Sequence, residues 1–512
     1  MTGTTLILEN ANIVDVERGT SSIGSIAVHD KHIQAVGTTD EIAVLKSERT
    51  QTIDLRGQTV VPGFIDTHAH LVVTGLSLIE IDLRQAQSIQ DIQDLVASRA
   101  ASQPQGTLIR GWGLQENLLR ETRFPNRHEL DAVAPQHYVR LMREDGHSSV
   151  VNSKLLIHLG YDSETPGAEV VDGQLTGVLR AQAQSKVDPQ VWDLELPGLR
   201  EQGMVKASQR ALQVGLTTVH TLEGSDQLPH EQFLIAARLV SAMPIHIVLW
   251  YQTTYFERVE DVGLPRIGGC IMLDGAPGSY TGALFEPYSD NPASSGTLYF
   301  TDEAINAFIL EAHRRGYQIA VHATCQRAVE QALVAYEKAL DAYPKADHRM
   351  RIEHGYGMPT AEQLERMGHR GIILSTQPAF LHYRMDMYYR RFGRRWRQVH
   401  PHRLALEHGV TIAGGSDSFV TPLYPLLGIH CAVNHPVEDQ RVGVREALRW
   451  FTCNAAYAGF EDDVKGAIAP GKIADLTVLG EDILTANALT IKDIQVLMTI
   501  VGGRVEYSTQ QM

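Results

Sequence analysis

Two histidines separated by one residue close an apolar stretch near the start of the chain. Residues 60–70 read as an apolar β-strand run in which Pro62-Gly63 leads to the two histidines at its end, His68 and His70. Side chains alternate along a strand, so residues two apart point to the same side. Two neutral imidazoles on one side can bind one divalent metal ion. A lone His-x-His pair also arises by chance, but at the carboxyl end of a barrel strand it would lie where catalytic residues collect.

Several later strand-like runs also end in residues that can bind a metal or a proton. These residues are His220, Cys270, Asp274, His322, His354 and Asp417. In a (β/α)8 barrel the carboxyl ends of the strands converge on one face. Each residue also has a plain structural interpretation: His220 packs in the core, Asp274 starts a turn and Asp417 caps the following helix. Their coincidence at strand ends favours a shared metal site.

The middle of the chain alternates apolar runs with helical patterns, which is the rhythm of a parallel α/β sheet. The expected strands are 215–220, 245–250, 270–274, 318–322, 349–354, 371–375 and 411–417, and the expected helices include 303–315, 326–341 and 442–452. Residues 4–60 and 466–507 read instead as short strands separated by glycine-rich turns. We therefore expect a small β domain that is assembled from both termini.

Length, charge and cysteine content exclude several classes of protein. A chain of 512 residues is too long for one compact core, so we expect a large domain and a smaller one. The formal charge of −15 argues against nucleic acid as a partner, because phosphate binding needs a basic face. No apolar run is long enough to span a bilayer, and no signal peptide is visible. The four cysteines form no disulfide framework, so a cytoplasmic location is expected.

These motifs match a known family. The chain resembles the metal-dependent amidohydrolase superfamily, and within it the amidohydrolase family 3 branch that includes N-substituted formamide deformylase. The matching segments are 62–70, 144–147, 274–279, 321–323, 351–354, 414–417, 454–456 and 466–476. The resemblance runs nearly from end to end, and its motifs are specific for the superfamily but weak on substrate.

The resemblance implies the fold and its domains. The expected fold is α/β, a (β/α)8 TIM barrel with a small β-sandwich domain built from both termini. Residues 1–61 and 461–512 would form the sandwich. Residues 62–460 would form the barrel, with an insertion around 80–200.

The resemblance also implies the metal ligands. They would be His68, His70, His322, His354 and Asp417, which suit zinc, with iron, manganese, nickel or cobalt as alternatives. One position departs from the family. Four residues before Asp274-Gly275 the branch usually has a lysine that becomes carboxylated and bridges two metals, and here that residue is Cys270.

Two interpretations of Cys270 remain open. It is either a thiolate ligand, since a metal deprotonates a thiol and zinc accepts sulfur, or a small buried residue beside a site with one ion. Cys325, three residues after His322, has the weaker claim to be a ligand.

The implied activity is metal-dependent hydrolysis of a C–N bond (amide, formamide, carbamate or cyclic amide) in a small molecule. Water activated by the metal would attack the substrate, with Asp417 as the general acid and base. His147 and His220 are candidate donors to the substrate carbonyl. We expect Arg351 and Glu353, which flank His354, to face outward as salt-bridge partners.

Substrate contacts are expected from the insertion and the loops. The candidates are Trp112, Tyr280, Gln377 and His382, whose aromatic members suit an apolar or aromatic group. Residues 383–392 read as a lid or as an amphipathic helix, and the helix is favoured. Homo-oligomers are the family's usual state.

Two other functions stay open. One is a deaminase of the same superfamily with one metal, although deaminases usually place a glutamate after the strand-5 histidine, where this chain has Ala323-Thr324-Cys325-Gln326. The other is a barrel scaffold without catalysis, which the retention of four histidines and Asp417 disfavours.

Overall fold

The computed structural model describes residues 4–144, 146 and 148–509, which group into two compact units. The first unit holds Met1–Leu71, Ser208–Asp226 and Ala237–Met512, and the second holds Val72–Ala207 and Gln227–Ala236. Across the described ranges, every helix is too short or too polar to cross a membrane.

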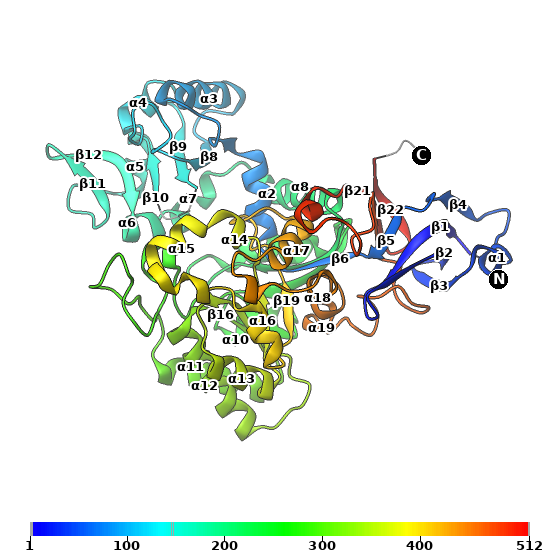
Figure 1. Cartoon of the computed structure of the whole chain (residues 1–512). Coiled ribbons are helices and arrows are strands. Elements are labelled where there is room, and N and C mark those ends of the chain that lie inside the picture. The colour runs from blue at the N-terminus through cyan, green and yellow to red at the C-terminus, as the bar shows by residue number, and fades with distance from the viewer. Residues whose placement is uncertain (1–3, 145, 147, 510–512) are drawn as a thin grey trace. The chain divides into compact units, whose positions relative to one another are not determined.

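Strands from both ends of the chain meet in one sheet of the first unit (Figure 1). The strands are β1 (Leu6–Asp15), β2 (Thr20–His29), β3 (His32–Gly37), β4 (Gln51–Asp54), β5 (Thr59–Pro62), β20 (Leu476–Leu479), β21 (Val496–Val501) and β22 (Arg504–Ser508). Their order is β22-β21-β20-β5-β1-β2-β3, with β4 beside β1, and β20 joins the two termini by antiparallel pairing with β5. These strands form a single hydrogen-bonded sheet, so the expected sandwich stays a prediction.

Eight parallel strands carry or precede the candidate metal ligands. Three of them form one sheet in the order β14 (His246–Tyr251), β13 (Leu216–Glu223), β6 (Phe64–Ala69). The other five form a second sheet in the order β15 (Arg266–Ile267), β16 (Gln318–Cys325), β17 (Arg351–Gly357), β18 (Ile373–Thr376), β19 (Ile412–Gly414). Past the ends of β19 and β6, the amide of Asp417 donates to the carbonyl of His68, and the amide of His70 donates to the carbonyl of Ser418, both at 2.7 Å. Over the described residues the strands thus make two parallel sheets rather than one closed ring of hydrogen bonds.

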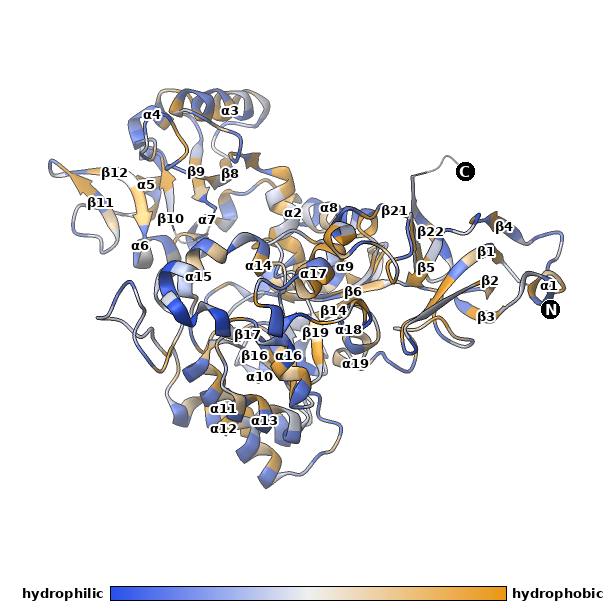
Figure 2. Ribbon diagram, in the orientation of Figure 1, coloured by the Kyte–Doolittle hydropathy of each residue, from blue (hydrophilic) through white to orange (hydrophobic). Residues whose placement is uncertain are grey.

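Helices follow these strands as the sequence predicts. They are α9 (His230–Leu239), α10 (Phe256–Asp261), α11 (Asp302–Arg314), α12 (Gln326–Ala342), α13 (Ala361–Arg370), α14 (Phe380–Tyr383), α15 (Met385–Phe392), α16 (His402–Glu407), α17 (Pro425–Val433), α18 (Val444–Trp450) and α19 (Cys453–Ala458), and α1 (Thr39–Ala43) belongs to the terminal sheet. Helix α13 shows why they form where they do. Thr360 and Gln363 cap its start reciprocally, and Gly371 ends it in the left-handed conformation. Hydrophilic and hydrophobic residues alternate along α11, α12 and α13, which is typical of helices packed on a sheet (Figure 2).

The second unit contains the segment in which the insertion is expected, and the domain boundaries stay a prediction. Its six-stranded sheet contains β7 (Ile81–Asp82), β8 (Leu108–Leu114), β9 (Tyr138–Arg143), β10 (Ser148–Val151), β11 (Ala168–Val171) and β12 (Gln174–Arg180). The helices of this segment are α2 (Leu71–Ile79), α3 (Ile89–Ser102), α4 (Arg127–Asp131), α5 (Ser153–Leu159), α6 (Ala181–Ser185), α7 (Asp188–Val191) and α8 (Leu199–Gln213). Ile92, Val139 and Leu141 are fully buried within it, so this unit has a core of its own.

Candidate metal centre

One group of ligand atoms forms where β6 and β19 end. Atom Nε2 of His70 lies 3.2 Å from Oδ1 of Asp417, and Nε2 of His68 lies 3.4 Å from the same oxygen. His68 is fully buried, while the side chain of His70 keeps 15% exposure. The backbone bonds between Asp417 and His68 hold the carboxylate beside the two imidazoles.

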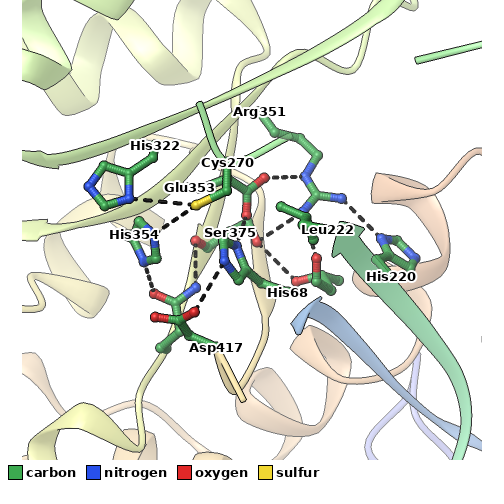
Figure 3. Close-up of polar contacts among 12 residues, drawn as sticks. His68, His220, Leu222, Cys270, His322, Arg351, Glu353, His354, Ser375 and Asp417 are labelled. Carbon is green, nitrogen blue, oxygen red and sulfur yellow. Dashed lines mark hydrogen bonds and ion pairs between the residues drawn. The ribbon is translucent and has the colours of Figure 1, made fainter. Parts of the chain in front are cut away.

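A second group forms around Cys270, which follows β15. Its Sγ lies 3.6 Å from Nδ1 of His322, on β16, and 3.6 Å from Nε2 of His354, on β17 (Figure 3). His68 belongs to this group as well, because ligand atoms of His68, Cys270 and His354 all lie within 4.8 Å of one another. The thiol therefore faces the histidines, and the two groups share His68.

The histidines of the first group are oriented by acceptors behind them. Atom Nδ1 of His68 lies 2.6 Å from the carboxylate of Glu353, and Nδ1 of His70 lies 2.6 Å from the carbonyl oxygen of Leu222. Since both partners only accept, each Nδ1 carries the proton and each Nε2 presents a lone pair toward Asp417.

The histidines of the second group are oriented in the same way. Atom Nδ1 of His354 donates to the side-chain oxygen of Gln377 at 2.8 Å, which leaves Nε2 facing Cys270. Atom Nε2 of His322 lies 3.0 Å from the hydroxyl of Thr324 and 3.3 Å from the carbonyl of Gly275, which leaves Nδ1 facing Cys270. Burial, reinforced by the nearby His68, lowers the pKa of His354 to about 4, so its imidazole is neutral.

This donor set fits a divalent cation. Four imidazole nitrogens, one carboxylate and one sulfur converge, and the buried Nε2 of His68 has no hydrogen-bond partner. Burial raises the pKa of the Cys270 thiol, partly offset by His68, so a cation beside it is needed to form the thiolate. Burial alone would raise the pKa of Asp417, but the imidazoles of His68 and His70 beside it lower it, so this carboxylate is ionised.

The expectation that Arg351 and Glu353 face outward is wrong. Both side chains are fully buried, and Nε of Arg351 donates to Oε1 of Glu353 at 2.7 Å. Alternation along β17 would turn Glu353 away if His354 faced the site, but the φ angle of His354 is +75° and breaks that alternation. Burial alone would raise the pKa of Glu353, but Arg351 and then His68 lower it to about 2.

Of the two candidate donors to the substrate carbonyl, His220 lies among the described residues. His220 is fully buried on β13, and its Nδ1 accepts a hydrogen bond from Arg351 at 3.0 Å. It is thus bonded to the Arg351–Glu353 pair rather than to Cys270 or Asp417. His147 lies outside the described residues.

The candidate substrate contacts have different local environments. Gln377 is buried behind His354, and His382 is exposed on α14. The hydroxyl of Tyr280 accepts from Arg391 at 2.7 Å, and the guanidinium lies 3.8 Å from the centre of its ring. Trp112 is half-buried on β8, in the second unit.

Two further features of the sequence have structural roles. Residues 385–392 form helix α15, which buries Tyr388 and Phe392. The buried carboxylate of Asp274 accepts the backbone amides of Ala283, Thr324 and Cys325, at 2.8 to 3.1 Å. It thereby fixes the end of β16 just after His322.

Comparisons with known proteins agree with this geometry. A model of the amidohydrolase family matches residues 51–507. Protein LONG AFTER FAR-RED 3 from Arabidopsis thaliana is 28% identical over 98% of this chain and 91% of its own length. N-substituted formamide deformylase from Arthrobacter pascens is 27% identical over 98% of both chains. The crystal structure of an uncharacterized metal-dependent hydrolase from Pyrococcus furiosus has a TM-score of 0.79 and 24% identity, covering 94% of this chain and all of that one. This structural likeness indicates a barrel-type α/β fold.

Proposed function

We propose a catalytic arrangement for this chain, which belongs to the amidohydrolase family and is a metal-dependent hydrolase of carbon–nitrogen bonds other than peptide bonds. Its substrate is a small molecule and its cofactor is a divalent metal, as the family implies. Our proposal concerns the ligands, the proton carrier and the class of substrate.

The observation that carries the proposal is the convergence of lone pairs. The second nitrogen of each histidine is engaged by an oxygen behind it, so the four free nitrogens are fixed before any ligand arrives. Such preorganisation is what metal sites require of their supporting residues.

We assign two ligand sets. His68, His70 and Asp417 would hold one cation, and Cys270, His322 and His354 would hold a second beside it. Imidazole, carboxylate and thiolate together favour zinc. When bound, the metal supplies a water of lowered pKa and a Lewis acid for the substrate carbonyl.

Asp417 would act as general base and then as general acid. Its carboxylate is ionised and fixed beside His68 and His70, so it can take a proton from the attacking water. It would then return that proton to the leaving nitrogen, which leaves as a neutral amine.

For the substrate we propose an amide or formamide with an apolar or aromatic substituent. The similarity to a formamide deformylase and the aromatic candidates Trp112 and Tyr280, together with His382, support this class. His147 stays our proposed donor to the substrate carbonyl. Because Nδ1 of His220 accepts a hydrogen bond from Arg351, we propose that His220 has a structural role.

The test combines metal analysis with three variants. We expect about two zinc ions per chain for wild type, fewer for Cys270→Ser, and an unchanged number for the control Cys453→Ser, whose thiol contacts a carbonyl on α18 instead. Asp417→Asn should lose hydrolysis of N-aryl formamides by at least about a hundredfold while keeping the native thermal transition. Full metal content in Cys270→Ser would remove the thiolate from the ligand set, and full activity in Asp417→Asn would refute its role.

A further inference from the structure

We propose that Glu353 is a positioning residue which fixes His68 and strengthens it as a metal ligand where the two groups of ligand atoms meet, and that Arg351 holds Glu353 in place. This inference rests on the proposed function, because it assigns a task to residues behind the proposed ligands.

The contact between Glu353 and His68 is close and excluded from water. Oxygen Oε2 of Glu353 lies 2.6 Å from Nδ1 of His68, and both side chains are fully buried. The other oxygen, Oε1, accepts from Nε of Arg351 at 2.7 Å. One oxygen of the carboxylate therefore contacts the guanidinium of Arg351, and the other contacts the imidazole of His68 (Figure 3).

Arg351 is anchored independently of Glu353. Its Nη2 donates to the carbonyl of Thr67, the residue before His68, at 2.6 Å, and to the hydroxyl of Ser375 at 3.2 Å. Its Nη1 donates to His220 at 3.0 Å, and its guanidinium lies 4.9 Å from the ring centre of Trp250. Contacts with β6, β13, β14 and β18 thus fix the guanidinium, which in turn leaves the carboxylate of Glu353 one orientation.

The choice of partner sets His68 apart from the other three histidines. His70 donates to a backbone carbonyl, His322 lies beside a hydroxyl and a backbone carbonyl, and His354 donates to the neutral amide of Gln377. Within the described part of the site, His68 is the histidine whose outer nitrogen is hydrogen-bonded to a carboxylate, at 2.6 Å, whereas Nε2 of His322 lies 3.5 Å from Oδ1 of Asp274. His68 is also the residue that both groups of ligand atoms contain. A carboxylate behind an imidazole raises its basicity as a ligand and fixes its tautomer.

An ion pair that only stabilised the fold would look different. Arginine and glutamate prefer a bidentate pairing, with both carboxylate oxygens on one guanidinium. Here one carboxylate oxygen of Glu353 contacts His68. The remaining donors of Arg351 form hydrogen bonds with Thr67, Ser375 and His220. The geometry therefore serves the orientation of His68 as well as charge compensation.

Zinc affinity measured by competition with a chromophoric chelator tests the inference. We expect Glu353→Gln to bind zinc 10 to 100 times more weakly than wild type. The matched control is Glu337→Gln, which removes a carboxylate from the ion pair with Arg366, on α13. It should leave zinc affinity unchanged. Nitrogen NMR of the metal-free protein should show His68 losing its fixed Nδ1–H tautomer in Glu353→Gln.

The outcomes separate this inference from the proposed function. Equal zinc affinities and an unchanged tautomer in Glu353→Gln would overturn the inference while leaving the metal site intact. A wild-type protein that binds no zinc would overturn the proposed function, and this inference with it. If Glu353→Gln fails to fold because Arg351 is left unpaired, the double variant Arg351→Gln/Glu353→Gln removes both charges. Weaker zinc binding in that variant supports the inference, and wild-type affinity refutes it.

Discussion

A single methyl group at Gly415 should displace His68. A Cβ atom at Gly415 would lie 2.8 Å from both the backbone nitrogen and the Cβ of His68, and 3.2 Å from Oδ1 of Asp66. Ordinary contact begins at 3.4 Å, so the two backbones must separate by about 0.6 Å. His68 cannot yield alone, because Glu353 holds its Nδ1 and Asp417 bonds to its carbonyl. The displacement therefore reaches both ligand groups.

The expected cost follows from that displacement. Shifts of this size at a reacting centre reduce rates by roughly ten- to a hundredfold, equivalent to about 1.4–2.8 kcal/mol of transition-state stabilisation. We expect Gly415→Ala to lose this much in kcat/KM for an N-aryl formamide and to bind zinc more weakly in chelator competition. The control is Gly480→Ala, whose new Cβ would meet its nearest neighbour at 3.7 Å. If both variants keep wild-type activity and zinc affinity, then His68 is not held as the structure indicates, and the reasoning fails.

Three more outcomes can be measured. Cys270 stands where the family usually carries a carboxylated lysine, so zinc loading of the wild type should not depend on bicarbonate. The variant Cys270→Lys should acquire that dependence. A bicarbonate requirement in the wild type would contradict the thiolate assignment. Burial lowers the pKa of His435 to about 4. The folded state therefore resists protonation of His435 that the unfolded chain accepts below about pH 6.5, so His435 should contribute on the order of 2 kcal/mol to the stability lost between pH 7 and pH 4.5. In urea titrations, His435→Asn should reduce that loss, and an unchanged loss would contradict this assignment. Arg391→Ala, which removes a charged donor from Tyr280, should raise KM roughly tenfold without changing zinc content, and an unchanged KM would remove Tyr280 from the substrate site.

Much of the site could be predicted because the rules involved are local. A strand places residues two apart on one side, which pairs His68 with His70, and parallel strands end at one edge, which adds His322 and Asp417. The fold of residues 72–207 was harder to predict. Its six-stranded sheet combines the local hairpin of β11 and β12 with the pairing of β12 and β10, which are distant in sequence and carry no strong local pattern that predicts their register.

The supporting residues were missed for a physical reason that the sequence does not display. Strict alternation makes neighbours such as Glu353 and His354 face opposite sides of a strand. Because His354 was assigned to the site, the sequence predicted that the side chain of Glu353 faces outward. The positive φ of His354 removes this conflict, and the buried guanidinium of Arg351 compensates the charge that Glu353 brings inside. A residue with a strained backbone is retained where the surrounding structure fixes it, and here Gln377 and Cys270 do so through the two ring nitrogens of His354. An Arg-x-Glu-His sequence on a barrel strand thus admits a second interpretation, in which ligand, carboxylate partner and counter-ion lie on one strand and all face the site.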